Sequence, residues 1–161
     1  MRAAPADLSK IVWRRVSRFQ QPEESLGYLL WHVTHGWIRF LNNVLSELGL
    51  THLQFLLIGS TAWLSRTGSV SQARLADFFK MDPMLVSKTL RTLERNGIVM
   101  RRADPSDSRA KQVLLTEEGL ELFLRGAPLI DRAYDKFFAP FGNSTKSVHA
   151  ALLKLYRTID K

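Results

Sequence analysis

One helix-forming segment, residues 83–96, carries small and cationic side chains on one side only. At about 100° per residue, Val86, Leu90 and Leu93 fall on the opposite, apolar side. The polar side carries Met84, Ser87, Lys88, Arg91 and Arg95. Lysine and arginine donate to guanine O6 and N7, serine binds bases or phosphates, and methionine contacts a thymine methyl group. The segment therefore predicts a helix that reads the major groove of duplex DNA, with an ordinary solvated helix face as the alternative.

A second cationic group follows this helix. Two short strand-like runs, 98–102 and 112–115, flank a polar, turn-rich loop, which predicts a hairpin. The candidate DNA-binding residues of the hairpin are Arg101, Asp107, Arg109 and Lys111. Arginine on an extended loop is favoured in the negative potential of a minor groove. Asp107 is two residues from Arg109 and is expected to hold its guanidinium; the alternative is a solvated loop with an incidental ion pair.

Helix start and stop signals place both groups in a helix-turn-helix with a wing. A short helix should precede residues 83–96 after a tight turn, and Gly97 should end the second helix. Pro83 suits the first position of that helix. The expected N-terminal capping residues are Thr51, which forms a capping box with Gln54, and Ser71, Asp82 and Thr116.

Longer helices are expected on either side of this lobe. One should run from about Pro22 to Gly49 and is apolar on two sides, so that it can face its own domain and a partner subunit or ligand. Another starts after Thr116 with an expected kink at Pro128, and a last one starts near Ser144. The predicted fold is mainly α with a small β wing. Its predicted parts are an arm and dimerisation helix (1–50), a winged helix-turn-helix lobe (51–116) and C-terminal dimerisation helices (117–161).

The distribution of charge agrees with a polyanionic partner. The chain has a net charge of +8 and a pI near 10.2. Residues 66–111 carry ten Lys or Arg against five Asp or Glu, the first 22 residues carry five against one, and the remainder carries eight against nine. Nucleic acid or an anionic membrane would attract such a chain, whereas generic solubility charge is the alternative.

Several classes of protein are disfavoured by what the sequence lacks. It has no cysteine, which excludes disulfides and thiolate metal sites and fits a reducing cytoplasm. No apolar run has membrane-spanning length, and we expect no signal peptide. No nucleophile elbow, P-loop or H-E-x-x-H motif occurs, so no catalytic site and no cofactor are expected. His32 and His35 have metal-ligand spacing, but no acidic residue joins them and no metal site is predicted.

Three stretches of sequence resemble the MarR family of bacterial transcription regulators. They are DPMLVSKTLRTLERNGIV at 82–99, RRADPSDSRA at 101–110 and LLTEEG at 114–119. The resemblance implies a homodimer whose terminal helices interlock and whose winged lobes straddle a pseudopalindromic DNA site. It also implies that Arg109 is the wing arginine and Asp107 its partner. The chain departs from the family members that sense oxidants through a cysteine, and its N-terminal arm is longer than usual.

The family resemblance also implies a small-molecule effector, because many relatives release DNA when an aromatic acid or phenol binds. The candidate ligand-binding residues are Trp31, His32, His35, Ile38, Arg39 and Phe55. A histidine and an arginine beside aromatic rings suit a carboxylate on an apolar ring. Dimer packing with satisfied polar groups is the alternative reading of the same residues.

Two functions from different classes follow. The first is a homodimeric, ligand-responsive transcription regulator, most simply a repressor, that binds specific duplex DNA. The second is a winged-helix module that binds another protein through its basic faces without specific DNA binding. A steep dependence of DNA affinity on salt would favour the first, since neutralised phosphates release counterions.

Overall fold

The computed structural model describes residues 5–103 and 111–159, which form two compact units, 1–38 and 39–161. In the first unit, the helices are η1 (Leu8–Lys10), α1 (Trp13–Val16), η2 (Pro22–Glu24) and the first part of α2 (Leu26–Leu45). The second unit contains the rest of α2, η3 (Ser46–Leu48), α3 (His52–Ser65), α4 (Gln72–Phe79), α5 (Pro83–Arg95), β1 (Val99–Ala103), β2 (Lys111–Leu115), α6 (Glu117–Phe138), η4 (Ala139–Ser144) and α7 (Thr145–Ile159).

The long helix starts later than its sequence suggests. Pro22 opens a separate 3-10 turn, in which the Ser25 N–H donates to the Pro22 carbonyl at 3.0 Å. Ser25 then has extended backbone (φ −87°, ψ 118°), which interrupts the helix. Its hydroxyl instead accepts a hydrogen bond from the N–H of Tyr28 at 3.4 Å. The predicted start at Pro22 is therefore wrong by four residues, because proline favours a first turn but does not fix its type.

The helices of the lobe begin where capping residues were expected. Thr51 forms a capping box with Gln54 at the start of α3. The side chains of Ser71, Asp82 and Thr116 accept backbone N–H groups at the starts of α4, α5 and α6. Each cap satisfies backbone donors that have no partner inside the helix. These helix starts are confirmed, while α6 continues through Pro128 to Phe138.

A two-stranded antiparallel sheet forms the wing. Val99 of β1 lies opposite Leu115 of β2, and Ala103 lies opposite Lys111. The N–H of Val113 donates to the Val70 carbonyl at 2.7 Å, so β2 is also tied to the chain just before α4. Within the part of the chain that the structure describes, this sheet is the only one, which confirms the mainly α fold with a small β wing.

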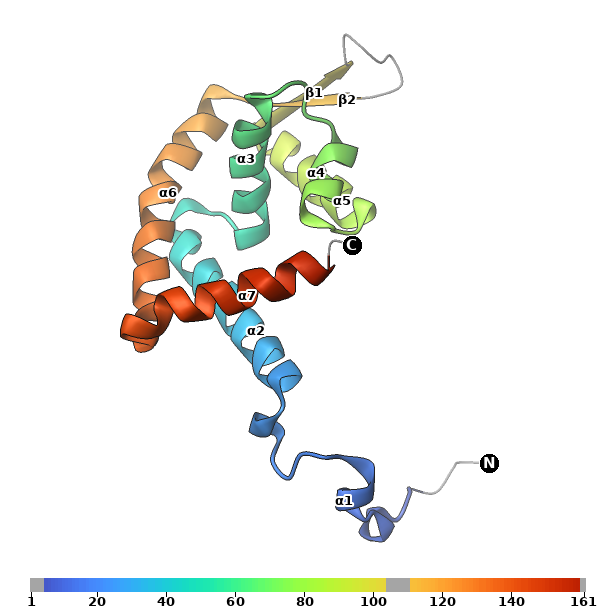
Figure 1. Cartoon of the computed structure of the whole chain (residues 1–161). Coiled ribbons are helices and arrows are strands. Elements are labelled where there is room, and N and C mark those ends of the chain that lie inside the picture. Colours follow the sequence, from blue (N-terminus) through green and yellow to red (C-terminus); the bar gives the residue numbers. More distant parts are fainter. Residues whose placement is uncertain (1–4, 104–110, 160–161) are drawn as a thin grey trace. The chain divides into compact units, whose positions relative to one another are not determined.

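One hydrophobic core holds the winged lobe together. It takes fully buried side chains from α3, α4, α5 and the wing, including Ile58, Leu75, Leu90 and Val113. Figure 1 shows these elements clustered together, with α6 running beside α3. The first half of α6 also belongs to this core, since Leu122 is buried within it. This core does not bear on the predicted role of residues 117–161 in dimerisation, so the predicted division of the chain into three parts stays a prediction.

Two glycines of α6 allow the helix to approach the lobe at backbone distance. A Cβ atom on Gly119 would lie 2.1 Å from the Ile98 carbonyl oxygen. A Cβ atom on Gly126 would lie 2.2 Å from the ring of Phe55, which is itself buried. Any side chain at either position would displace the start of the wing or the core ring.

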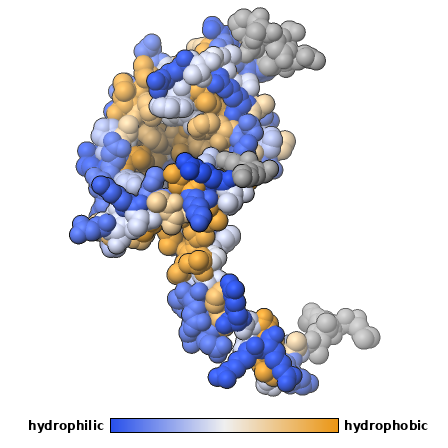
Figure 2. Space-filling view, in the orientation of Figure 1, coloured by the Kyte–Doolittle hydropathy of each residue, from blue (hydrophilic) through white to orange (hydrophobic). Residues whose placement is uncertain are grey.

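The last helix differs from the other α-helices of the second unit in having no buried residue among those described. Leu152, Leu155, Tyr156 and Ile159 are all exposed, Ile159 to 73%. Figure 2 shows apolar side chains at the surface of the same unit. In the described ranges 5–103 and 111–159, no helix is long and apolar enough to cross a membrane.

Candidate nucleic-acid interface

The inner side of α5 fixes this helix in the lobe. Its N-terminus is held by Asp82, whose carboxylate accepts the N–H groups of Met84 (2.6 Å) and Leu85 (3.1 Å). Pro83 occupies the first position, where its missing N–H costs nothing. The buried residues of the helix are Val86, Leu90 and Leu93, each with no exposed surface. The orientation of the helix about its own axis is therefore set by the core.

The outer side of α5 is correspondingly turned to solvent. Met84 is 71% exposed, Lys88, Arg91 and Arg95 are exposed, and Ser87 is half-buried. No carboxylate among the described residues forms an ion pair with Lys88 or Arg91, whereas the Arg95 guanidinium lies 3.5 Å from the Thr92 hydroxyl. The structure thus brings the five predicted residues onto one accessible face, as their spacing indicated.

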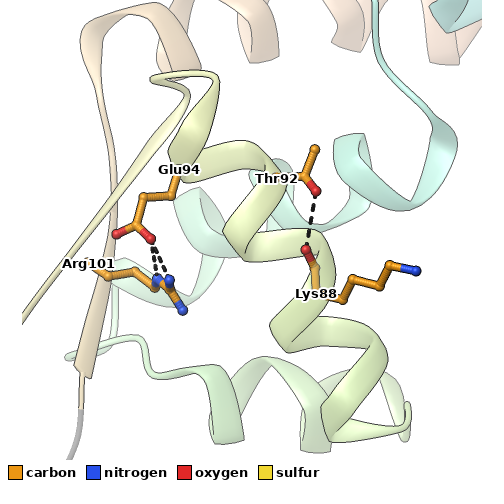
Figure 3. Close-up of polar contacts among 4 residues, drawn as sticks. All are labelled: Lys88, Thr92, Glu94 and Arg101. Atoms are coloured by element: carbon orange, nitrogen blue, oxygen red, sulfur yellow. Dashed lines mark hydrogen bonds and ion pairs between the residues drawn. The ribbon is translucent and has the colours of Figure 1, made fainter.

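Arg101 has a different environment from the one expected of a DNA contact. Its guanidinium donates through Nε to the Glu94 carboxylate at 2.9 Å and also through Nη2 to the same oxygen. The Arg101 side chain is only 15% exposed. Figure 3 shows this pair joining β1 to the last turns of α5, with the Lys88 side chain extending elsewhere. The pair therefore fixes the wing against the recognition helix.

The same ion pair explains the acidity of Glu94. The hydrogen bond from Arg101 lowers the pKa of the Glu94 carboxyl, and the positive charges of Arg101 and Lys111 act in the same direction. Glu94 therefore stays ionised to lower pH than an isolated glutamate. Sequence reasoning missed this residue, although its opposite charge to Arg101 across a helix-to-strand turn was a usable signal.

The rest of the wing is described in part. Lys111 is exposed at the start of β2, and Arg102 donates through Nε to Gln112 Oε1 at 3.4 Å. Asp107 and Arg109 lie outside the described residues, so their predicted roles stay predictions. Arg101 and Lys111 are both placed on the wing strands, but only Lys111 of these two is exposed to a partner.

Not all cations of the central segment are available to a partner. Arg74 of α4 donates to the Ser69 carbonyl (2.8 Å) and to the Thr67 hydroxyl (2.7 Å), which closes the turn before α4. Lys80 lies 2.9 Å from the Asp77 carboxylate. Together with Arg101, these residues have structural contacts, so the charge count of the central segment includes cations that are already engaged within the lobe.

The predicted ligand-binding residues are divided between the two units. In the first unit, the Trp31 and His35 rings lie 4.0 Å apart, and His35 Nδ1 is 2.7 Å from the Trp31 carbonyl oxygen. His32 stacks on Tyr28 with ring centroids 4.2 Å apart. The remaining predicted member in this unit, Ile38, is also exposed.

In the second unit, Arg39 is exposed, whereas Phe55 is buried in the core against Phe123, with ring centroids 5.8 Å apart. The pocket predicted from these six residues stays a prediction. Among the described residues, no three His, Asp or Glu side chains gather in a group that could hold a metal ion.

Comparison with known sequences agrees with this geometry. Residues 50–111 match the model of the MarR family. The chain is 38% identical over 124 residues to an uncharacterised HTH-type transcriptional regulator, YdcH of Bacillus subtilis, covering 76% of this chain and 84% of the relative. It is 33% identical over 108 residues to the HTH-type transcriptional repressor Rv2887 of Mycobacterium tuberculosis, covering 67% of this chain and 76% of the relative.

Solved structures share the fold. A mutant of Escherichia coli MarR, crystallised with operator DNA, aligns with a TM-score of 0.75 at 22% identity, covering 91% of this chain and 99% of that one. CouR of Rhodococcus jostii, bound to p-coumaroyl-CoA, aligns with a TM-score of 0.72 at 25% identity, covering 84% and 94%. With a capped α4–α5 pair, a β wing and an accessible cationic helix face, the chain belongs to the MarR family and is a transcriptional regulator of the MarR type.

Proposed function

We propose that this regulator binds a specific duplex DNA site by placing α5 in the major groove. The observation that carries the proposal is the division of α5 into a buried apolar side and an accessible side with Lys88 and Arg91. Cations on an exposed helix face can reach guanine O6 and N7 once the opposite side is anchored. The E. coli MarR complex with operator DNA supports docking of this fold on a duplex.

The wing contributes positioning and phosphate contacts. Arg101 pairs with Glu94, so it orients the wing relative to α5 and does not read bases itself. Lys111 is accessible for a phosphate. The proposed insertion of Arg109 into a minor groove, with Asp107 holding it, still rests on the sequence and family resemblance alone.

The functional unit is proposed to be a homodimer. Support comes from α7, whose exposed leucines, Leu152 and Leu155, leave an apolar side uncovered in the single chain. In this arrangement the long helix that follows the arm within residues 1–50 and the helices of 117–161 form the dimer region, and the lobe 51–116 binds DNA. Two recognition helices then lie about 34 Å apart, one turn of duplex, so the site is pseudopalindromic.

Repression with release by a small molecule is the proposed mode of action in the cytoplasm. The similarity to a repressor, Rv2887, supports repression rather than activation. The similarity to CouR, a structure bound to p-coumaroyl-CoA, supports a small aromatic acid or its conjugate as effector. A ligand acts only through its differential affinity for the DNA-fitting and non-fitting states of the dimer.

The test is fluorescence anisotropy with a selected site and with random duplex at several salt concentrations. We expect tight wild-type binding to the selected site, a steep fall with salt, and weaker binding with relaxed specificity for Lys88→Ala. Lys146→Ala, an exposed cation of α7, is the control and should bind like wild type. Weak binding of both duplexes, independent of salt, would instead favour a protein-interaction module.

The effector is tested in the same assay. Aromatic acids are titrated into the preformed protein–DNA complex, and one of them should lower the affinity at saturation. If none alters DNA affinity, the ligand-responsive part of the proposal is wrong, while the DNA-binding part stands.

A further inference from the structure

The N-terminal arm, residues 5–21, carries positively charged side chains that have no part in the DNA contacts proposed for the winged lobe. Its only carboxylate, Asp7, accepts hydrogen bonds from the N–H (3.1 Å) and hydroxyl (2.7 Å) of Ser9. Lys10 Nζ lies 3.7 Å from the same carboxylate, and the hydrogen bonds from Ser9 lower the pKa of Asp7. Among the described residues, Arg14 and Arg15 therefore have no acidic partner.

The local geometry separates these two arginines from the apolar residues of the arm. In α1, Trp13 and Val16 fall on one side of the single helical turn and Arg14 and Arg15 on the other. Trp13 lines a hollow of about 290 Å³ together with the aromatic rings of Phe19 and Tyr28. Neither arginine lines that hollow, and both are exposed.

The structure thus leaves both sides of this turn open to solvent, with Trp13 66% and Val16 68% exposed and Arg14 and Arg15 exposed on the opposite side. Figure 2 shows hydrophilic and apolar residues side by side along this segment. The third arginine, Arg18, is already engaged, since its guanidinium lies 4.8 Å from the centre of the Phe19 ring. The available charge is accordingly that of Arg14 and Arg15.

We infer that the arm is a second, sequence-independent DNA contact in which Arg14 and Arg15 of each subunit bind backbone phosphates. This inference rests on the proposed function, since it needs a DNA-bound regulator. Guanidinium groups pair with phosphate through two parallel hydrogen bonds, which favours arginine at such contacts. Both arginines are exposed, so their guanidinium groups are accessible to a phosphate.

An anionic membrane is the competing partner, and the geometry favours it less. Helices that lie on membranes present an apolar face over several turns. Here α1 comprises only four residues, a single turn, and its largest apolar side chain, Trp13, is 66% exposed and also lines the hollow within its own unit. A single turn with adjacent arginines fits point contacts with phosphates along a duplex better than an extended lipid-facing surface.

The experiment measures the salt dependence of binding to a selected operator for the full chain and for Arg14→Ala/Arg15→Ala. Removing one phosphate-binding arginine should make the slope of log K against log salt shallower by about 0.9. Four arginines in a dimer therefore predict a slope shallower by roughly 2 to 4, with the preference for operator over random duplex unchanged. Thermal unfolding confirms that the variant is folded.

Two matched variants isolate the phosphate contact from general charge effects. Arg14→Lys/Arg15→Lys keeps both charges and should retain most of the slope. Arg125→Ala/Lys146→Ala removes the same net charge from exposed positions of α6 and α7 and should leave the slope as in wild type.

The outcomes separate failure of this inference from failure of the proposed function. A steep wild-type slope that persists in Arg14→Ala/Arg15→Ala overturns the arm contact and leaves DNA binding intact. If the slope persists and the substitution abolishes binding to vesicles of phosphatidylcholine and phosphatidylglycerol, the arm is a membrane contact. A flat wild-type slope overturns DNA binding itself, and the arm inference with it.

Discussion

Helices α5 and α7 are both amphipathic, but only α5 has its apolar side covered within a single chain. The inner apolar residues of α5, Val86, Leu90 and Leu93, are completely buried, and its polar side is exposed. In α7 most of the large apolar residues are exposed, and none of its described residues is buried. A covered apolar side makes a helix part of a finished fold, whereas an uncovered one indicates a partner. The comparison assigns proposed DNA recognition to one helix and proposed assembly to the other.

The largest expected effect comes from the covered side of α5. Leu90→Ala should lower the free energy of unfolding by about 2–5 kcal/mol, because it removes a fully buried side chain and leaves a cavity. Urea denaturation followed by circular dichroism measures the change. A decrease below about 0.5 kcal/mol would mean that the buried side of α5 does not stabilise the lobe.

The next effect concerns the uncovered side of α7. Leu155→Asp should weaken a dimer by about 2–4 kcal/mol, since the substituted residue occurs twice in a symmetric interface and replaces apolar burial by a charge. That is roughly a thirty- to several-hundredfold rise in the dimer dissociation constant, measured by sedimentation. Lys154→Ala on the same helix is the control. An unchanged dimer would place the interface elsewhere.

The exposed side of α5 separates affinity from stability. Arg91→Ala, adjacent to Leu90 but on the other side of the helix, should cost about 1–3 kcal/mol of operator affinity while the free energy of unfolding changes by under about 0.5 kcal/mol. Anisotropy and urea denaturation are measured on the same preparation. An Arg91→Ala protein that unfolds early but binds normally would reverse the assigned roles of the two sides.

The smallest effect lies in the pair that joins the wing to α5. Glu94→Gln should lower stability by about 0.5–1 kcal/mol at neutral pH, because a partly exposed ion pair contributes little. Since the pKa of Glu94 is lowered in the fold, its stabilisation is present above the unfolded-state pKa and is lost as pH falls through the folded value.

Glu121→Gln is the matched control for this pair, because Glu121 and Arg125 lie 3.8 Å apart with both side chains more than half exposed. At neutral pH, Glu121→Gln should change the urea midpoint less than Glu94→Gln does, and acid titration of the midpoint should lose a component in Glu94→Gln. Identical profiles for wild type and Glu94→Gln would remove the wing pair as an acid-sensitive contact.

Local signals in the sequence predicted most of the fold. Thr51, Ser71, Asp82 and Thr116 cap the helices that they were expected to cap, because capping depends on a side chain and the few backbone groups next to it. The division of α5 into two sides follows from helical periodicity alone. The start of α2 was missed, since the choice between a 3-10 turn and an α-helix at Pro22 is finely balanced.

Contacts between elements could not be predicted from such local signals in the sequence. Arg101 was predicted to contact DNA from its charge and its place near the wing, yet its partner Glu94 depends on how β1 crosses the end of α5. Arg74 likewise counted as positive charge, but it closes a turn through Thr67 and Ser69. Counting cations therefore overestimates the surface available to a polyanion, and only the folded chain shows which of them are occupied.

The close approach of α6 to the lobe has a consequence for the tolerance of the chain to mutation. Gly119 and Gly126 are seven residues apart, two turns of one helix, and each meets a neighbour that cannot move away cheaply. In a library that samples every amino acid at every position of α6, these two positions should accept glycine alone. Their exposed neighbours Glu118 and Arg125 should accept nearly everything. The pattern of permitted residues along α6 would thus trace the line on which it touches the lobe.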